Sequence, residues 1–90
     1  MDVIWAPAAL ADLHRIRTYI GHFNPAAARR MGFRLVEAGD SLAAMPERGR
    51  PIGRGRRELV AVWPYVIRYQ VRGESVWILR IRHGRQLPPA

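Results

Sequence analysis

The sequence contains no cysteine, no lysine and no long uninterrupted apolar run. The lack of cysteine excludes a disulfide framework and a zinc site built on thiolates. No apolar stretch approaches the ~18 residues that a membrane-spanning helix needs. The first ten residues also lack the basic and apolar regions of a signal peptide. We therefore expect a soluble cytoplasmic protein that has no membrane partner.

The charge is basic and unevenly distributed along the chain. All fifteen basic residues are arginine. Residues 1–45 carry five arginines and four acidic residues, a net charge of +1, whereas residues 46–90 carry ten arginines and three acidic residues, a net charge of +7. GC-rich codon usage could explain arginine in place of lysine, but not its concentration in one half. Such a field favours an acidic partner, which could be nucleic acid or an acidic protein segment.

The first half of the chain predicts a strand followed by two helices. The apolar run at residues 2–5 is typical of a strand. Apolar residues then recur at helical spacing over residues 7–21 and again over residues 25–45. Asn24 and Pro25 are typical of a helix start, because asparagine caps the first N–H groups and proline needs no N–H at the first position. The short connection predicts an antiparallel helical hairpin.

In the second half the apolar period changes to two, which indicates strands. We expect strands at residues 58–62, 65–71 and 76–83, with a hairpin turn at residues 72–75. No linker or repeat divides the chain, so residues 1–90 are expected to form one domain. The order predicts an α+β fold with an N-terminal strand, an antiparallel helical hairpin and then a three-stranded antiparallel sheet.

The second predicted helix carries two glycines on one face. Gly32 and Gly39 each cost about 1 kcal/mol relative to alanine in a helix interior. They lie seven residues apart, and Ala28 continues the same face. Small residues on one face allow another helix to approach closely. That helix could be the first predicted helix, which we favour, or a helix of a partner protein.

Strand alternation places three arginines together. We expect the apolar set of the last two strands to face the helices: Tyr65, Ile67, Tyr69, Val71, Trp77, Leu79, Ile81 and His83. The other set, which includes Val76 and Ile78, then brings Arg68, Arg80 and Arg82 onto the open face. An anionic partner would relieve their mutual repulsion. The alternative is a solvated face whose long side chains cover the sheet.

No catalytic or metal-binding motif stands out in the sequence. The three histidines, His14, His22 and His83, lack metal-ligand spacing, and no two acidic residues suggest an acid–base pair. Residues 49–55, GRPIGRG, lack the spacing of a phosphate-binding loop and precede no helix. We therefore predict no metal and no cofactor, and small-molecule catalysis is disfavoured.

The stretch RGRPIGRGRR, residues 48–57, allows two interpretations. It could be a disordered arm that grips nucleic acid, or a loop that joins the two halves of a small domain. Its five arginines favour the first possibility. Its glycines and proline are equally typical of tight turns.

Five segments in order resemble the ParE branch of the RelE/ParE toxins of bacterial type II toxin–antitoxin systems. They are WAPAALADLHRIRTYI, NPAAARRM, MPERGRPI, RELVAVWPYVIRYQV and VWILRIRHGR, which together span nearly the whole chain. The resemblance implies the same fold of strand, helical hairpin and three-stranded sheet. It also implies that PERGRP is an ordered connection from the second helix to the next strand, and not a free arm.

The resemblance further implies a toxin that is neutralised by a small acidic ParD-like antitoxin in a hetero-oligomer. ParE-like members poison DNA gyrase, whereas RelE-like members are ribosome-dependent mRNA endoribonucleases. Val66 stands where nuclease relatives often carry arginine, and the tail after Arg85 has no tyrosine to stack on a base. Both departures favour gyrase as the target. His83 stands where some nuclease relatives have a catalytic histidine, which keeps the ribonuclease alternative open.

Two sets of site residues follow. The residues expected to contact the target are Arg68, Arg80, Arg82, His83 and Arg85, and the first four would be catalytic in a nuclease. The residues expected to contact the antitoxin are Ala28, Gly32, Leu35 and Gly39. An extended antitoxin segment would continue toward the basic sheet. We expect no direct sequence-specific DNA binding by this chain.

Overall fold

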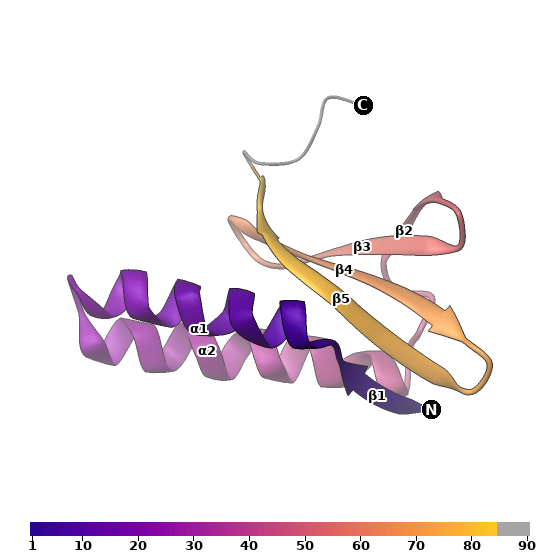
Figure 1. The fold of residues 1–90 in the computed structure, drawn as a ribbon, viewed down its shortest axis with the longest axis horizontal. Helices are drawn as coiled ribbons and strands as arrows, with labels where there is room; N and C mark the ends of the chain where they lie inside the picture. The colour runs from indigo at the N-terminus through magenta and orange to yellow at the C-terminus, as the bar shows by residue number, and fades with distance from the viewer. Residues whose placement is uncertain (85–90) are drawn as a thin grey trace.

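The computed structural model describes residues 1–84 and shows a two-layer α+β fold (Figure 1). Its elements are β1 (Asp2–Trp5), α1 (Pro7–Gly21), α2 (Pro25–Asp40), a 3₁₀ turn (Ser41–Ala43), β2 (Arg50–Gly53), β3 (Arg56–Val62), β4 (Tyr65–Arg72) and β5 (Ser75–His83). The two helices lie side by side as one layer and cover one face of the sheet (Figure 1). The predicted fold class and the helical hairpin are confirmed.

The second helix begins as predicted but ends earlier. The side chain of Asn24 accepts a hydrogen bond of 3.0 Å from the N–H of Ala27, and Pro25 occupies the first helical position. The α-helix stops at Asp40 and not near residue 45. There the Ser41 hydroxyl donates a 2.6 Å hydrogen bond to the carbonyl of Ala38, a local bond that competes with regular helix.

The sheet has five strands in the order β1-β5-β4-β3-β2, and not three. β1 joins it by pairing parallel with β5, while the other neighbours are antiparallel. The strand β2 was not predicted from the sequence; it pairs with β3 in a hairpin inside the arginine- and glycine-rich stretch. Gly53, Arg54 and Gly55 form its turn, with φ of 97°, 56° and 73°. Glycine takes up such positive φ angles without strain.

A buried tyrosine holds the segment before this hairpin in place. The Tyr69 hydroxyl donates to the carbonyl of Pro46 and accepts from the N–H of Gly49, both at 2.8 Å. Arg57 adds a 2.8 Å hydrogen bond to the carbonyl of Gly49. The stretch is therefore an ordered connection with its own strand, as the resemblance implied, and the free-arm interpretation is wrong.

A β-bulge in β5 reverses part of the predicted alternation. Arg68 lies opposite Arg80, but Tyr69 lies opposite Ile78, so Leu79 is an extra residue between two pairs. As a consequence Val76 and Ile78 point into the core and are fully buried. Trp77 instead lies under the guanidinium of Arg72, which is 5.1 Å from the ring centroid. The prediction that Trp77 and Leu79 face the helices is wrong.

The core lies between the helices and the sheet, and the small face of α2 packs within it. Leu35 and Leu42 pack there with Ile67, Tyr69 and Ile78, all fully buried. A Cβ at Gly32 would lie 2.7 Å from the side chain of Arg17 on α1. At Gly39 it would collide with the side chains of Trp5 and Ile78. The element that packs closely against Gly32 is thus the first helix, as favoured. The element that packs against Gly39 is the sheet.

Candidate functional site

The C-terminal half of β5 has an edge that faces α1. β1 pairs with β5 only as far as Ile78, so within residues 1–84 no strand continues the sheet beside residues 79–83. Asp12 of α1 occupies this edge, and its carboxylate accepts a 2.9 Å hydrogen bond from the backbone N–H of Ile81. The carboxylate therefore takes the place of the missing strand for one backbone group.

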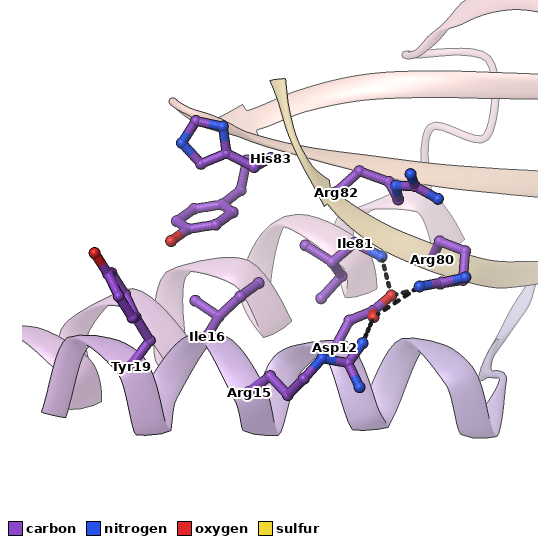
Figure 2. A pocket seen from close by; sticks show the side chains of 9 residues that line it. Asp12, Arg15, Ile16, Tyr19, Arg80, Ile81, Arg82 and His83 are labelled. Carbon is purple, nitrogen blue, oxygen red and sulfur yellow. Dashed lines mark hydrogen bonds and ion pairs between the residues drawn. The ribbon is translucent and has the colours of Figure 1, made fainter. Parts of the chain in front are cut away.

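Asp12 also binds the side chain of Arg80. Its two carboxylate oxygens accept hydrogen bonds from Nε of Arg80 at 2.7 Å and from Nη2 at 3.1 Å, and Arg15 donates from one turn further along α1 (Figure 2). Burial alone would raise the pKa of Asp12. The hydrogen bonds from Arg80 and Ile81 and the nearby arginine charges outweigh that effect and hold the pKa below its ordinary value. The same carboxylate raises the pKa of Arg80.

Asp12, which is 4% exposed, was not among the site residues predicted from the sequence. It lies 68 residues before Arg80. A lone aspartate in an amphipathic helix resembles an ordinary solvated side chain, so only its burial reveals its role. No local signal could have identified it.

A cleft of about 510 Å³ lies between α1 and the end of β5 (Figure 2). We call it the α1–β5 cleft. Its lining residues are Asp12, Arg15, Ile16, Tyr19, Tyr65, Arg80, Ile81, Arg82 and His83. Three arginines and a single acid line it, so the lining carries net positive charge. The volume falls within the range typical of small-ligand sites.

Aromatic rings gather at one end of this cleft. Tyr65 and His83 are opposite each other in neighbouring strands, and their rings meet edge to face with centroids 5.7 Å apart. Tyr19 lies at the same end (Figure 2). Burial, followed by the negative charge that Tyr19 can carry, raises the pKa of Tyr65. Tyr65 therefore keeps its proton at neutral pH and remains a hydrogen-bond donor.

A row of charged residues crosses the open face of the sheet. Register places Arg50 opposite Glu58, Glu58 opposite Arg68 and Arg68 opposite Arg80. Ion pairs link Glu58 to Arg50 at 3.4 Å and to Arg68 at 3.0 Å. Asp12 ends the row by pairing with Arg80. We refer to Arg50, Glu58, Arg68, Arg80 and Asp12 as the charge row.

The ion pairs of the charge row alter the expectation that the clustered arginines repel one another. Arg68, Arg80 and Arg82 alternate onto the same face, as expected. However, Arg68 and Arg80 each bind a buried carboxylate, so their repulsion is offset within the chain. Of the described members of the predicted set, Arg80, Arg82 and His83 border the cleft and Arg68 does not. Arg85 lies outside the described residues.

The residues predicted to contact the antitoxin are buried within the chain. Ala28, Gly32, Leu35 and Gly39 all face the protein's own interior. The two glycines lie against α1 and the sheet, and contact of these four residues with the antitoxin stays a prediction. The exposed large apolar side chains of the helical hairpin are Leu10, Tyr19, Phe23 and Phe33.

Within residues 1–84, no three histidine or acidic side chains come together in a way that could hold a metal ion. Neither helix of this part of the chain is long and apolar enough to cross a membrane.

Comparison with known proteins relates the chain to toxins that carry the names ParE and RelE. Residues 3–88 match the family described as the ParE toxin of the type II toxin–antitoxin system parDE. The chain is 58% identical over 86 residues to Toxin RelE2 of Caulobacter vibrioides, covering 96% of this chain and 98% of the relative. It is 39% identical over 85 residues to Toxin RelE1 of the same organism, covering 91% of each. A solved chain of the chromosomal ParDE system from P. aeruginosa superimposes with a TM-score of 0.83 at 31% identity, covering 92% of this chain and 95% of that one.

Proposed function

We propose, since this chain belongs to the ParE family of toxins of type II toxin–antitoxin systems, that its target in the cytoplasm is DNA gyrase. The toxin would be held inactive by a small acidic ParD-like antitoxin and would act when that antitoxin is lost. The observation that favours binding over RNA cleavage is the state of Arg68 and Arg80. Both hold buried carboxylates of the charge row.

A nuclease needs cations aimed at the charge that develops on the phosphate in the transition state. Arg68 directs Nε and Nη2 at Glu58, and Arg80 directs the same atoms at Asp12. Val66, at the position of an arginine in many nuclease relatives, is apolar and 2% exposed. These features support a toxin that acts by contact with its target protein.

The antitoxin contact is better placed on the exposed side of the helical hairpin. Tyr19 and Phe23 form an edge-to-face pair, with ring centroids 5.5 Å apart, although their side chains are 64% and 76% exposed. Phe33 on α2 is 70% exposed. Exposed aromatic rings are typical of interface anchors. An antitoxin with an apolar helix face and acidic flanks would complement these rings and the net charge of +8.

One observation favours the ribonuclease as a second candidate. His83 lies against Tyr65 beside Arg82 in an accessible cleft. An imidazole next to a phenol could serve as an acid–base pair. The two candidates differ in their product: covalent gyrase–DNA complexes in the first case, cleaved mRNA in the second.

Induced expression without antitoxin separates the two candidates. Gyrase–DNA covalent complexes and new mRNA 5′ ends would be measured in the same cells at the same times after induction. We expect gyrase complexes and double-strand breaks to precede any change in mRNA ends. A strain with a toxin-resistant gyrase serves as the control and should survive. Site-specific cuts in ribosome-bound mRNA, without DNA damage, would establish the second candidate and exclude the first.

A further inference from the structure

We propose that the α1–β5 cleft binds a nucleoside phosphate unit, an aromatic base joined to a phosphate, and holds it without cleaving it. This goes beyond the proposed gyrase target and does not depend on it. Three features of the cleft carry the inference: its two chemically different ends, the geometry of its arginines and its size.

The cationic end suits a phosphate. Arg15 and Arg80 reach it from α1 and β5, and their side chains are 64% and 40% exposed. Asp12 engages two nitrogens of Arg80 and one of Arg15, and a guanidinium carries five N–H donors, so both partly exposed side chains have further donors to offer a ligand. Arg82 lies on the same side (Figure 2). Planar arginine forks match the oxygens of a phosphate in pairs.

The other end suits a flat aromatic ring. Tyr19 and His83 lie there together, as Figure 2 shows, and Ile16 provides an apolar surface between the two ends. Aromatic side chains stack on any nucleic-acid base, because every base has a π-face. The hydroxyl of Tyr65, which keeps its proton, can donate to a base edge. A ligand that satisfies both ends must therefore join a ring to an anion.

The size of the cleft limits the ligand to one such unit. A volume of about 510 Å³ lies in the range of clefts that hold small molecules or cofactors. The cleft is open to solvent, so the unit could be a free nucleotide or one residue of a single-stranded nucleic acid. Both sources offer the same chemistry at the site, and the experiment distinguishes them.

The test measures binding to the purified full-length chain by titration calorimetry. The probes are AMP, adenosine, inorganic phosphate and a single-stranded decanucleotide. We expect AMP to bind at least about 10-fold more tightly than adenosine or phosphate alone, because only AMP fills both ends. Added salt should weaken AMP binding. If the decanucleotide displaces AMP and binds more tightly, the source is nucleic acid. If AMP binds at least as well, the source is a free nucleotide. Absence of binding by both would overturn the proposal.

Variants locate the site. Arg15→Ala and Tyr19→Ala remove exposed side chains from the two ends, and each should weaken AMP binding about 10-fold. Arg34→Ala and Phe33→Ala are the matched controls on α2, since both side chains are exposed and neither lines the cleft. An unchanged melting temperature would show that the variants fold. If AMP binds but cleft and control variants lose affinity equally, the cleft assignment is wrong.

The result is independent of the proposed target. Gyrase poisoning by the same variants is scored in a separate assay with purified gyrase. If the parent protein poisons gyrase but binds no nucleotide, this inference fails and the gyrase proposal stands. If the parent protein binds AMP but has no effect on gyrase, the gyrase proposal fails and this inference stands.

Discussion

Arg68 and Arg80 are directly opposite each other on neighbouring strands, yet each binds a buried carboxylate on its far side. Like charges in opposing positions destabilise a sheet. Here Glu58 draws one guanidinium toward β3, and Asp12 draws the other over the edge of β5 toward α1. The arrangement converts a repulsive pair into a row of ion pairs. It also brings Arg80 to the cleft, where its place depends on a helix far away in sequence.

Replacing Asp12 should destabilise the protein. Asp12→Ala removes the acceptor of the Ile81 N–H and the partner of Arg80, and we expect a loss of about 1.5–3 kcal/mol in the free energy of unfolding. Asp12→Asn should lose less, because an amide oxygen can still accept from Ile81. Urea denaturation measures both. Asp2→Asn, at an exposed position, is the control and should leave stability unchanged. Equal stability of Asp12→Ala and the parent protein would contradict this account.

Asp12 should also make stability depend on acidity. Its pKa is lower in the folded chain than the ordinary value of 3.8. The unfolded chain therefore takes up a proton first as pH falls, and the stabilisation present at neutral pH is lost as pH drops from about 5 through the folded pKa. We expect the urea midpoint to fall less steeply in Asp12→Asn than in the parent protein over this range. Parallel pH profiles would refute the assignment.

The two glycines of α2 should respond differently to alanine. In Gly39→Ala the new methyl group meets the ring of Trp5 and the end of Ile78, so we expect a loss of about 1–3 kcal/mol. In Gly32→Ala it meets only the flexible side chain of Arg17, which can move away. The gain in helix propensity, about 1 kcal/mol, then compensates. Melting temperatures of the two variants give the comparison, and equal losses would be inconsistent with it.

The exposed rings of the helical hairpin should carry antitoxin binding. Phe23→Ser and Phe33→Ser should each weaken the complex by about tenfold, or 1.4 kcal/mol, with little effect on the fold. Surface plasmon resonance with the cognate antitoxin measures the affinity. Increasing salt should mainly slow association, because long-range charge attraction sets the encounter rate. Arg54→Ala, in the distant β2–β3 turn, is the control. If both serine variants bind like the parent, the antitoxin uses another surface.

His83 distinguishes the two candidate functions. If the chain poisons gyrase by contact, His83→Ala removes one of several expected contacts with the target and should reduce toxicity only gradually, because no proton transfer is required. If the chain is a ribonuclease, loss of a general acid or base should reduce cleavage by about 100-fold or more. Growth after induction and mapping of mRNA ends measure the two effects. His14→Ala, on the exposed part of α1, controls for loss of a histidine as such.

Much of the fold was predictable from local chemistry. Asn24 and Pro25 specify the start of α2 because a cap and a fixed φ act within one turn. Period-two patterns likewise located β3, β4 and β5. The strand β2 was not predictable, because its four exposed residues carry no apolar alternation and its pairing depends on β3.

The candidate site was predictable only in part. Alternation correctly placed Arg80 and Arg82 on one face. In the first half of β5, however, the bulge at Leu79 makes the side chains point to the opposite faces from those predicted. A single inserted residue reverses every side chain before it. The sequence cannot show the insertion, because it is defined only by the partner strand.

The amino-acid sequence by itself determined the class of fold, the basic character of the second half and the family, since propensity, charge and motif order are properties of neighbouring residues. The tertiary structure alone decided which arginines are neutralised and where the cleft forms. The carboxylate of Asp12 meets Arg80, which lies 68 residues further along the chain, and the edge of β5 only once the intervening chain has folded. Burial then makes that contact strong, because the carboxylate, withdrawn from water, must be satisfied by the groups that surround it.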